Sequence, residues 1–522
     1  MLISFIKKNN LFISFSIFLL FIIKLIDTKS LSHKLFHDDS FYYFEIAKNF
    51  IDGYGFTFDN LSKTNGFHLL WMIFLIFFGF IFNSLLEIAQ ISIWIQTLLI
   101  ILSFKSINNA YRNNFTLKVI NVSVHLIFLP FFLNGMETSL AIYLFNLLII
   151  KLYITKNYSK LAILVFLILL TRYDAVIILF LIFLIQLYRT KKYFYLKQFS
   201  FGFIAFILVI VSFNYFLGFG IDNLSTSSEV KNYWFELEYQ AHLENCEIQN
   251  INCSLYFIKN KIEFVPIYIT NVSKLLYSFI NYSSAYNASG EIPVNRLLPF
   301  LAVVSPFFIF NILKRKKINR LDLNSLWVIS AIHLIVLSLS SIIWLVFDWY
   351  NYFFISVLIF TIVEIFNNKS IVIVFPIFIF IIINSYIYLF SPQSQWSKAY
   401  SATVNHINTY ENVVIGTWAA GHIGYYSDNP VINLEGLVSS PEVIKLNKSD
   451  NLSNYLLENV NYVVTNFDPL KAPGDPKWFY ALRINPLIQL EEKLELVETI
   501  QSNDESYIMY IFRINNSSKN DL

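Results

Sequence analysis

Long apolar segments recur between residue 11 and residue 390, and they limit what this chain can fold into. Each is close to the ~20 residues with which a helix crosses a bilayer. Of the 522 residues, 56% are apolar and 14% are charged, more apolar sequence than a soluble protein of this length buries or exposes. We therefore expect a mainly α, polytopic transmembrane helical protein. The apolar runs cover residues 11–26, 69–83, 88–104, 119–134, 139–154, 158–171, 175–188, 199–217, 297–313, 324–347, 350–366 and 371–390.

Lysine and arginine residues fall in alternate connections between these runs, which the positive-inside rule assigns to the cytoplasm. The other connections, including the long loops 27–68 and 218–296, then lie outside. The segment 69–104 holds two apolar runs but must make one net crossing. We therefore expect about 11 net spans, with 69–83 tilted, re-entrant or partly interfacial. The basic connections contain Lys7, Lys8, Lys105, Arg112, Lys118, Lys151, Lys156, Lys160, Arg189, Lys191, Lys192, Lys197, Lys314, Arg315, Lys316, Lys317, Arg320 and Lys369.

This pattern predicts two domains. Residues 1–390 form the transmembrane domain, and its first apolar run is interpreted as a retained helix with a cytoplasmic N-terminus, since no small-residue cleavage site follows it. Residues 391–522, the tail, are more polar, and strand-like runs alternate there with helical stretches. We expect a small extracytoplasmic α+β domain that binds an acceptor, gates a site or only stabilises the external face. Its strand-like runs are Val413–Gly416, Val431–Leu434, Tyr462–Thr465 and Ser506–Ile514.

Adjacent carboxylates, Asp38 and Asp39, open the first external loop. Two such neighbours repel each other and resist desolvation, so the pair is a candidate general base or cation site. Helix capping accounts for one of them; we assign Asp39 to the cap and leave Asp38 for chemistry. The helix that follows has Phe41 and Phe44 on one face, and we expect it to lie on the membrane surface and to end at Gly53.

Charged residues at the ends of other apolar runs fall on the same outer side, although none of them served to assign the topology. Residues that are costly in lipid tend to mark function. A structural interpretation stands beside the functional one, in which Arg172 pairs with Asp174 and Asp348 merely ends a helix. These residues are Glu137, Arg172, Asp174, Arg296 and Asp348.

Other features exclude function classes or stay open. The net charge of +3 indicates no nucleic-acid partner, and no P-loop, Gly-x-Gly-x-x-Gly, His-Glu-x-x-His or Cys-x-x-Cys motif is present. His125 and His333 lie in apolar runs, where a buried, hydrogen-bonded histidine is favoured over a metal ligand. Cys246 and Cys253 in the long external loop either form a disulfide or remain free thiols, and their spacing does not decide between these.

Several short motifs follow one another in a recognisable order. They are Asp38–Asp39 with Gly53–x–Gly55–Phe56–Thr57–Phe58, Thr64–Asn65–Gly66–Phe67–His68–Leu69–Leu70–Trp71, Gly135–Met136–Glu137–Thr138, Thr171–Arg172–Tyr173–Asp174, and Trp418–Tyr425 with Val431–Leu437. Together they resemble bacterial GT-C membrane glycosyltransferases, a group similar to protein O-mannosyltransferases and to the lipid A aminoarabinose transferase. The likeness extends from residue 30 to about residue 465.

The resemblance implies an enzyme that moves a sugar from a polyprenyl-phosphate donor to an acceptor on the extracytoplasmic face of a bacterial plasma membrane. The acceptor is a glycolipid, a glycan or a protein, and membrane lipid is a further partner. Asp38 matches the first carboxylate of the catalytic loop, Asp39 the second acid, and Glu137 an acid that lines the site. Arg172 falls where the family has a basic residue near the donor phosphate.

This chain departs from the family in its first loop. Asn65 and Gly66 stand where the aminoarabinose transferase has a glutamate and a lysine, so the phosphate must be neutralised by His68, Arg172 or Arg296. The substrate-binding candidates are then Asn65, His68, Arg172, Asp174 and Arg296. The Asp38–Asp39 pair works either alone or around a divalent metal. Asp38 is expected to deprotonate the acceptor, with inversion at the sugar. The alternative function is a transporter or flippase of a lipid-linked saccharide.

Overall fold

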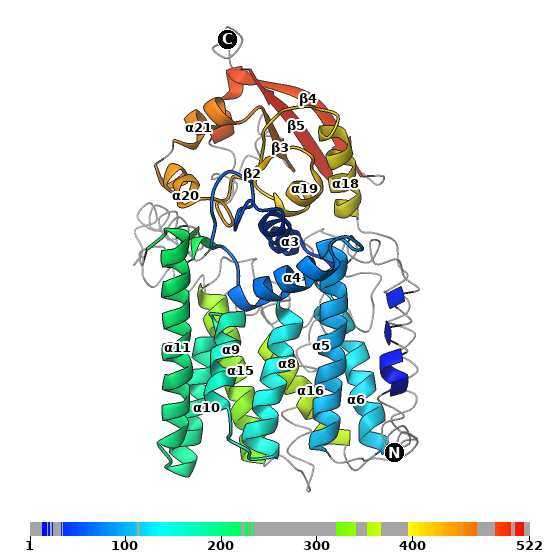
Figure 1. Cartoon of the computed structure of the whole chain (residues 1–522), viewed down its shortest axis with the longest axis vertical. Coiled ribbons are helices and arrows are strands. Elements are labelled where there is room, and N and C mark those ends of the chain that lie inside the picture. Colours follow the sequence, from blue (N-terminus) through cyan, green and yellow to red (C-terminus); the bar gives the residue numbers. More distant parts are fainter. Residues whose placement is uncertain are drawn as a thin grey trace, which may run out of the picture. The chain divides into compact units, whose positions relative to one another are not determined.

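The structure, a computed structural model, shows a mainly helical chain with a small sheet near the C-terminus (Figure 1). Contacts between residues divide the chain into two compact units. The helical unit comprises Met1–Leu31, Ile93–Ile207 and Phe257–Ser391, and the sheet unit comprises Ser32–Ser92, Leu208–Tyr256 and Pro392–Leu522. The division thus groups the first external loop with the tail. The structure describes residues 13–17, 19–20, 23–24, 33, 35–111, 115–220, 225–227, 229–230, 233, 320–340, 352–366, 395–449, 451–466, 486–502 and 507–515.

The helical unit is built from helices that lie side by side in Figure 1. Its close packing is clearest at Gly202, where an added Cβ atom would come within 2.6 Å of the Ala162 carbonyl oxygen. The described helices are α5 (Ile88–Ala110), α6 (Phe115–Ile127), α7 (Leu129–Phe132), α8 (Thr138–Ile149), the π-helix η1 (Ile150–Ile154), α9 (Leu161–Thr171), α10 (Ala175–Thr190), α11 (Phe194–Leu217), α15 (Arg320–Ser340) and α16 (Tyr352–Phe366). The chain passes between the units within α5 and α11.

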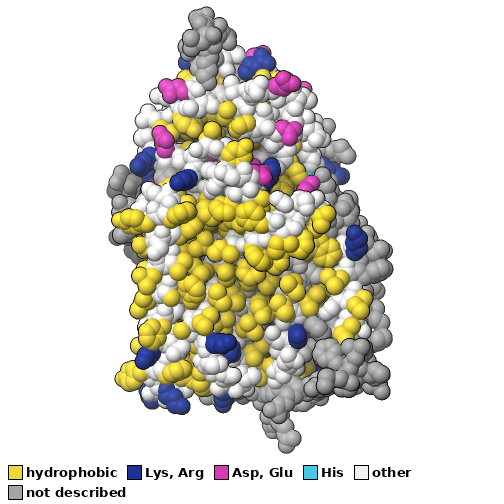
Figure 2. Space-filling view, viewed as in Figure 1, with side chains coloured by type: hydrophobic (Ala, Val, Ile, Leu, Met, Phe, Trp, Pro, Cys, Tyr) yellow, Lys and Arg dark blue, Asp and Glu magenta, His cyan; other side chains and the backbone are white. Residues whose placement is uncertain are grey.

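The two ends of this unit carry different side chains. Glu137 precedes α8 and Arg172 follows α9, and the two residues are in contact, so these consecutive helices run antiparallel. The connection from Thr155 to Lys160 therefore lies at the opposite end. Figure 2 shows hydrophobic side chains over the sides of the helices and Lys and Arg side chains below them. The basic connection and the Glu137–Arg172 pair thus occupy opposite ends, as the charge pattern predicted.

Among the described residues, two helices are long and apolar enough to be membrane-span candidates, Ile88–Ala110 and Phe194–Leu217. The apolar runs 297–313 and 371–390 lie outside the described residues, so about 11 net spans remain a prediction. Shorter apolar helices cover Leu69–Phe82, Leu117–Leu126, Thr138–Ile154, Leu161–Thr171, Ala175–Thr190 and Tyr352–Glu364.

The sheet of the second unit has, within the described residues, the strand order β2-β1-β3-β5-β4. β1 pairs in parallel with β2 and with β3, whereas β5 pairs antiparallel with β3 and with β4. The predicted C-terminal α+β region is therefore confirmed. Its elements are α18 (Gln395–Ile407), β1 (Ile415–Thr417), α19 (Gly421–Tyr426), β2 (Val431–Asn433), α20 (Pro441–Lys448), α21 (Leu452–Asn459), β3 (Tyr462–Thr465), the 3₁₀ helix η4 (Glu491–Lys493), β4 (Leu494–Gln501) and β5 (Ile508–Ile514).

The first external loop forms α3 (Asp38–Ile51), which differs from its prediction in two respects. The N-cap is His37, so the expectation that Asp39 caps this helix is wrong; both aspartates lie in the first turn, where the helix dipole favours negative charge. The helix is also buried on more than one face, including Glu45 and Asn49, because it packs against both α4 (Leu69–Phe82) and α19. It is therefore not a one-sided surface helix. As predicted, Gly53 follows its end, with φ of +94°.

Helix α4 is apolar all round but only partly buried. Its 14 residues span about 21 Å, shorter than the ~30 Å hydrocarbon core of a bilayer. One face, with Trp71 and Met72, is buried, and its Gly79 allows close approach to Ile51 of α3. The other face leaves large apolar side chains exposed: Ile73, Phe77, Phe80 and Ile81. This length agrees with the expectation that the segment does not make a full crossing on its own.

Candidate functional site

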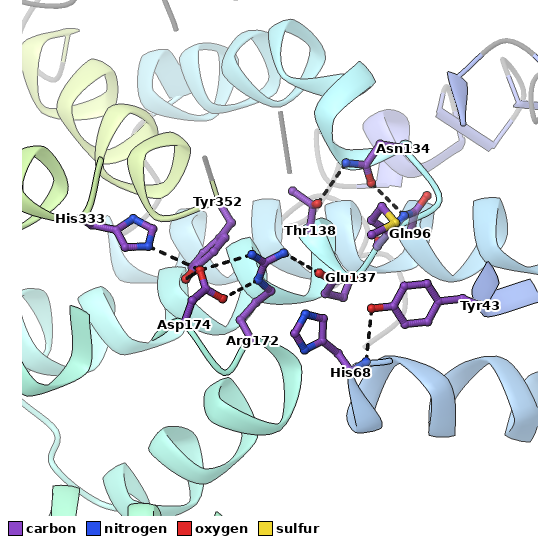
Figure 3. Close-up of polar contacts among 11 residues, drawn as sticks. Tyr43, His68, Gln96, Asn134, Glu137, Thr138, Arg172, Asp174, His333 and Tyr352 are labelled. Atoms are coloured by element: carbon purple, nitrogen blue, oxygen red, sulfur yellow. Dashed lines mark hydrogen bonds and ion pairs between the residues drawn. The ribbon is translucent and has the colours of Figure 1, made fainter. Parts of the chain in front are cut away.

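Glu137 and Arg172, from two separate sequence motifs, form a buried ion pair in the helical unit (Figure 3). Arg172 Nη1 donates to Glu137 Oε1 at 2.7 Å, and the side chains are 2% and 0% exposed. Arg172 also makes a bidentate contact with Asp174, in which Nε donates to Oδ1 at 2.9 Å and Nη2 donates to Oδ2 at 3.2 Å. The structure therefore brings three of the predicted site residues together.

Two further residues complete this group, which we call the Arg172 cluster: Glu137, Arg172, Asp174, His333 and Tyr352. The Tyr352 hydroxyl donates to Asp174 Oδ2 at 3.0 Å, and the Arg172 guanidinium carbon lies 5.1 Å from the centre of the Tyr352 ring. His333 Nε2 lies 3.5 Å from Asp174 Oδ2. Sequence reasoning missed Tyr352, because an aromatic residue at the start of an apolar run gives no polar signal.

A web of hydrogen bonds fixes the turn that carries Glu137 (Figure 3). Gln96 of α5 donates from Nε2 to the Met136 carbonyl oxygen at 2.7 Å and accepts from the Gly135 amide at 3.3 Å. The Asn134 amide group donates to Thr138 Oγ1 at 3.0 Å, and the turn needs a glycine at 135 because φ there is +79°. Glu137 is thereby held at the N-cap position of α8.

The charges in the cluster do not balance. Arg172 contributes one positive charge, whereas Glu137 and Asp174 bring two carboxyl groups, and Asp174 is the more exposed of these at 23%. Burial alone raises the pKa of Asp174, but the Arg172 guanidinium outweighs it, with help from His333, and holds that pKa well below its usual range. These contacts use three of the five N–H groups of Arg172, and the side chain is only 2% exposed, so a donor phosphate has little access to the other two. The geometry therefore favours a positioning role for Arg172.

Asp38 lies in the sheet unit, where backbone amides hold its carboxylate. Oδ2 accepts from the Gly421 amide at 3.0 Å and Oδ1 from the His422 amide at 2.8 Å. These hydrogen bonds favour the ionised carboxylate, and taking up a proton would weaken at least one of them. Asp39 is its half-buried neighbour on α3. The separation of roles that the sequence suggested is thus altered, since Asp38 is engaged by α19.

The other predicted residues of the first loop also make structural contacts. Asn65 donates from Nδ2 to Asn214 Oδ1 at 2.7 Å and accepts from the Thr226 amide at 2.8 Å, so it ties the loop to α11 and to the segment after it. The His68 amide donates to the Tyr43 hydroxyl at 3.2 Å, which fixes the start of α4 (Figure 3). Neither contact tests a role in binding substrate.

The prediction for His125 is confirmed. The side chain is buried, Nδ1 lies 2.8 Å from the Asn121 carbonyl oxygen, and Nε2 lies 3.0 Å from Ser103 Oγ. Among the described residues, no group of three or more His, Cys, Asp or Glu side chains is placed to hold a metal ion. The remaining predicted residues lie outside the described part of the chain: Arg296, Asp348, Cys246 and Cys253.

Comparison with known proteins bears on the tail. Residues 391–512 match a family model described as a domain of unknown function (DUF8728). That segment contains α18 to α21 and most of the sheet, whereas the Arg172 cluster and α3 lie outside it. A search of curated proteins finds no match. The chain is thus similar over its tail to a family whose own function is undefined.

Proposed function

We propose that this protein is a polytopic membrane glycosyltransferase of GT-C type, which moves a sugar from a polyprenyl-phosphate donor to an acceptor on the extracytoplasmic face of a bacterial plasma membrane. One observation carries the proposal most directly. Glu137 and Arg172 belong to two motifs of the GT-C resemblance and stand 35 residues apart, yet they meet at 2.7 Å with both side chains buried. A buried charged group of this kind is costly, which is typical of functional sites.

The membrane assignment rests on the composition, the charge pattern and the exposed apolar surface. Hydrophobic side chains cover the face of the helical unit seen in Figure 2, and the basic connections lie at the end away from Glu137 and Arg172. The exposed Phe77 and Phe80 of α4 fit contact with lipid at the outer interface. This arrangement supports an external site with lipid-linked substrates.

The proposed reaction needs one base and one leaving group. The acceptor hydroxyl oxygen attacks the anomeric carbon while the bond from that carbon to the phosphate oxygen breaks, which inverts the configuration. The hydroxyl proton passes to a carboxylate of the Asp38–Asp39 pair, and the polyprenyl phosphate departs as an anion. In the helical unit, Arg172 holds the carboxylates of Glu137 and Asp174 in position.

Transfer by the purified protein in lipid nanodiscs tests the proposal. With a radiolabelled polyprenyl-phosphate hexose and membrane extract as acceptor, we expect release of polyprenyl phosphate and labelled product. The double variant Asp38→Asn/Asp39→Asn should be slower by at least ~100-fold, the contribution of a positioned base. Near-normal transfer by a correctly inserted double variant would overturn the assignment of the base.

Mass spectrometry of surface glycolipids and glycoproteins, from cells with and without the gene, identifies the sugar and acceptor. An unchanged glycome, together with movement of a fluorescent lipid-linked saccharide across vesicles that contain the protein, would favour the transporter instead. In that case the lipid-linked saccharide crosses the bilayer with its sugar–phosphate bond intact.

A further inference from the structure

The parallel half of the sheet has a topology that defines where its loops can act. From β1 the chain passes through α19 to β2 on one side, and then through α20 and α21 to β3 on the other side of β1. In open parallel sheets such a reversal of strand order leaves a position at the carboxyl ends of the strands, where ligands usually bind. Here it lies beside Trp418, directly after β1, and Asn433, the last residue of β2.

Helix α3 takes up this position. The Tyr42 hydroxyl accepts from Asn433 Nδ2 at 3.0 Å and from the Ala420 amide at 3.3 Å, and it lies 3.5 Å from the Trp418 carbonyl oxygen. Asp38, one helical turn before Tyr42, binds the amides that open α19. Both side chains therefore point from one face of α3 onto the segment Trp418–His422, where the chain passes from β1 into α19.

Small residues on α19 make this approach possible. A Cβ atom at Gly421 would lie 2.0 Å from the Asp38 carbonyl oxygen, and one at Gly424 would lie 2.4 Å from the Phe58 ring. Neither distance leaves room for a side chain. The glycines of the Trp418–Tyr425 motif thus keep α19 against α3 and Phe58, a reason for the motif that the sequence alone did not supply.

We infer that the tail fixes the position of α3. Asp38 is then a positioning residue that anchors the first external loop to the tail, and Tyr42 is the second anchor. Of the three tail functions considered from the sequence, these contacts fit stabilisation of the external face, and they require neither acceptor binding nor gating. Their consequence for catalysis rests on the proposed function, whereas the anchoring itself does not. Loss of the anchor should reduce turnover by displacing Asp39 with the rest of α3.

Hydrogen exchange of the full-length protein in detergent measures the anchor directly. Asp38→Ala should speed exchange of the Gly421 and His422 amides about tenfold, and Tyr42→Phe should speed that of the Ala420 amide less, as expected for loss of charged and neutral hydrogen bonds. Tyr43→Phe is the matched control: it removes a hydroxyl from the same helix, but one that binds the His68 amide. It should leave the α19 amides unchanged. Unchanged exchange of these amides in both Asp38→Ala and Tyr42→Phe would overturn the inference.

Kinetics then separate positioning from direct chemistry. Gly421→Ala forces α19 away from α3 without altering any carboxylate, so under the inference it lowers kcat as Asp38→Asn does. The residual activity of Asp38→Asn should rise with pH over the same range as the wild-type activity, because Asp39, the base under this inference, is unchanged. Two results together would show instead that Asp38 is the base. The first is that Asp38→Asn loses the rise of activity with pH. The second is that Gly421→Ala keeps full activity while its β3 and β5 amides stay protected from hydrogen exchange, so that the sheet is folded. If the wild type transfers no sugar, the proposed function fails while the exchange result still decides the anchor.

Discussion

Asp174 and Asp38 are both partly exposed carboxylates at the start of a helix, yet they are held by different kinds of partner. In the helical unit, Asp174 is surrounded by the side chains of Arg172, Tyr352 and His333. Asp38 is held by the backbone amides of Gly421 and His422. Side-chain partners therefore leave a direct trace in residue types, as Arg172 and Asp174 did, whereas the backbone amides that bind Asp38 left only a glycine, Gly421, whose role the sequence did not reveal.

The largest expected effect on stability comes from removing Arg172, the cation that holds Asp174 in the helical unit. Arg172→Met leaves Glu137 and Asp174 without their guanidinium, so we expect a loss of about 3–5 kcal/mol in the free energy of unfolding. Denaturant unfolding in detergent micelles measures this. The triple variant Glu137→Gln/Arg172→Met/Asp174→Asn is the control and should lose less, because no charge is stranded. A loss below about 1 kcal/mol in the single variant would show that the pair is not buried as described.

In the sheet unit, a buried carboxyl group whose cationic partner is largely exposed behaves differently. Burial raises the pKa of Glu45 on α3 to about 7, although Lys48 at 3.4 Å acts in the opposite direction. Since the folded state keeps the proton that the unfolded state loses near pH 4.5, this contribution to stability is complete below that pH and is lost as the pH rises through 7.

We therefore expect Glu45→Gln to stabilise the protein at pH 8 by about 3 kcal/mol more than at pH 4.5, at ~1.4 kcal/mol per unit of pKa shift. Melting curves of the wild type and the variant across this range measure the difference. A gap between them that does not change with pH would contradict the raised pKa of Glu45.

A smaller effect of opposite sign comes from His422 in the same unit. Burial, with the neighbouring His33, lowers its pKa to about 3. His422 binds a proton below about pH 6.5 in the unfolded chain, but only near pH 3 in the folded state. The contribution of His422 to stability is therefore present above pH 6.5 and is lost as the pH falls towards 3.

The expected loss from His422 is about 2 kcal/mol at pH 5, from the same value per unit of pKa shift. His422→Gln should flatten this part of the stability profile, as followed by proteolysis of the tail. Asp174 is the reference, because its lowered pKa makes its own contribution fade only below pH 3.8. A profile as steep in His422→Gln as in the wild type would assign the acid sensitivity to another group.

The predictions from the sequence agreed with the structure where apolar or charged residues recur at a regular spacing. Runs of alternating apolar residues gave strands near β1, β2, β3 and β5. Strand β4 was missed: it carries Glu495 and Glu498 on an exposed edge and contains a bulge between Leu496 and Glu498, which breaks the alternation. The predicted one-sided α3 failed because both of its neighbours in the unit, α4 and α19, come from other parts of the chain.

The sequence by itself determined the helical character, the α+β tail and the placing of Glu137, Arg172 and Asp174 at one end of their helices, because hydropathy and charge act locally along the chain. Tertiary structure alone decided that Arg172 is shared by two carboxylates and that Asp38 binds the amides of α19. Such contacts join residues up to 384 positions apart, and hydrogen bonds to a backbone amide do not depend on the identity of the residue that donates them.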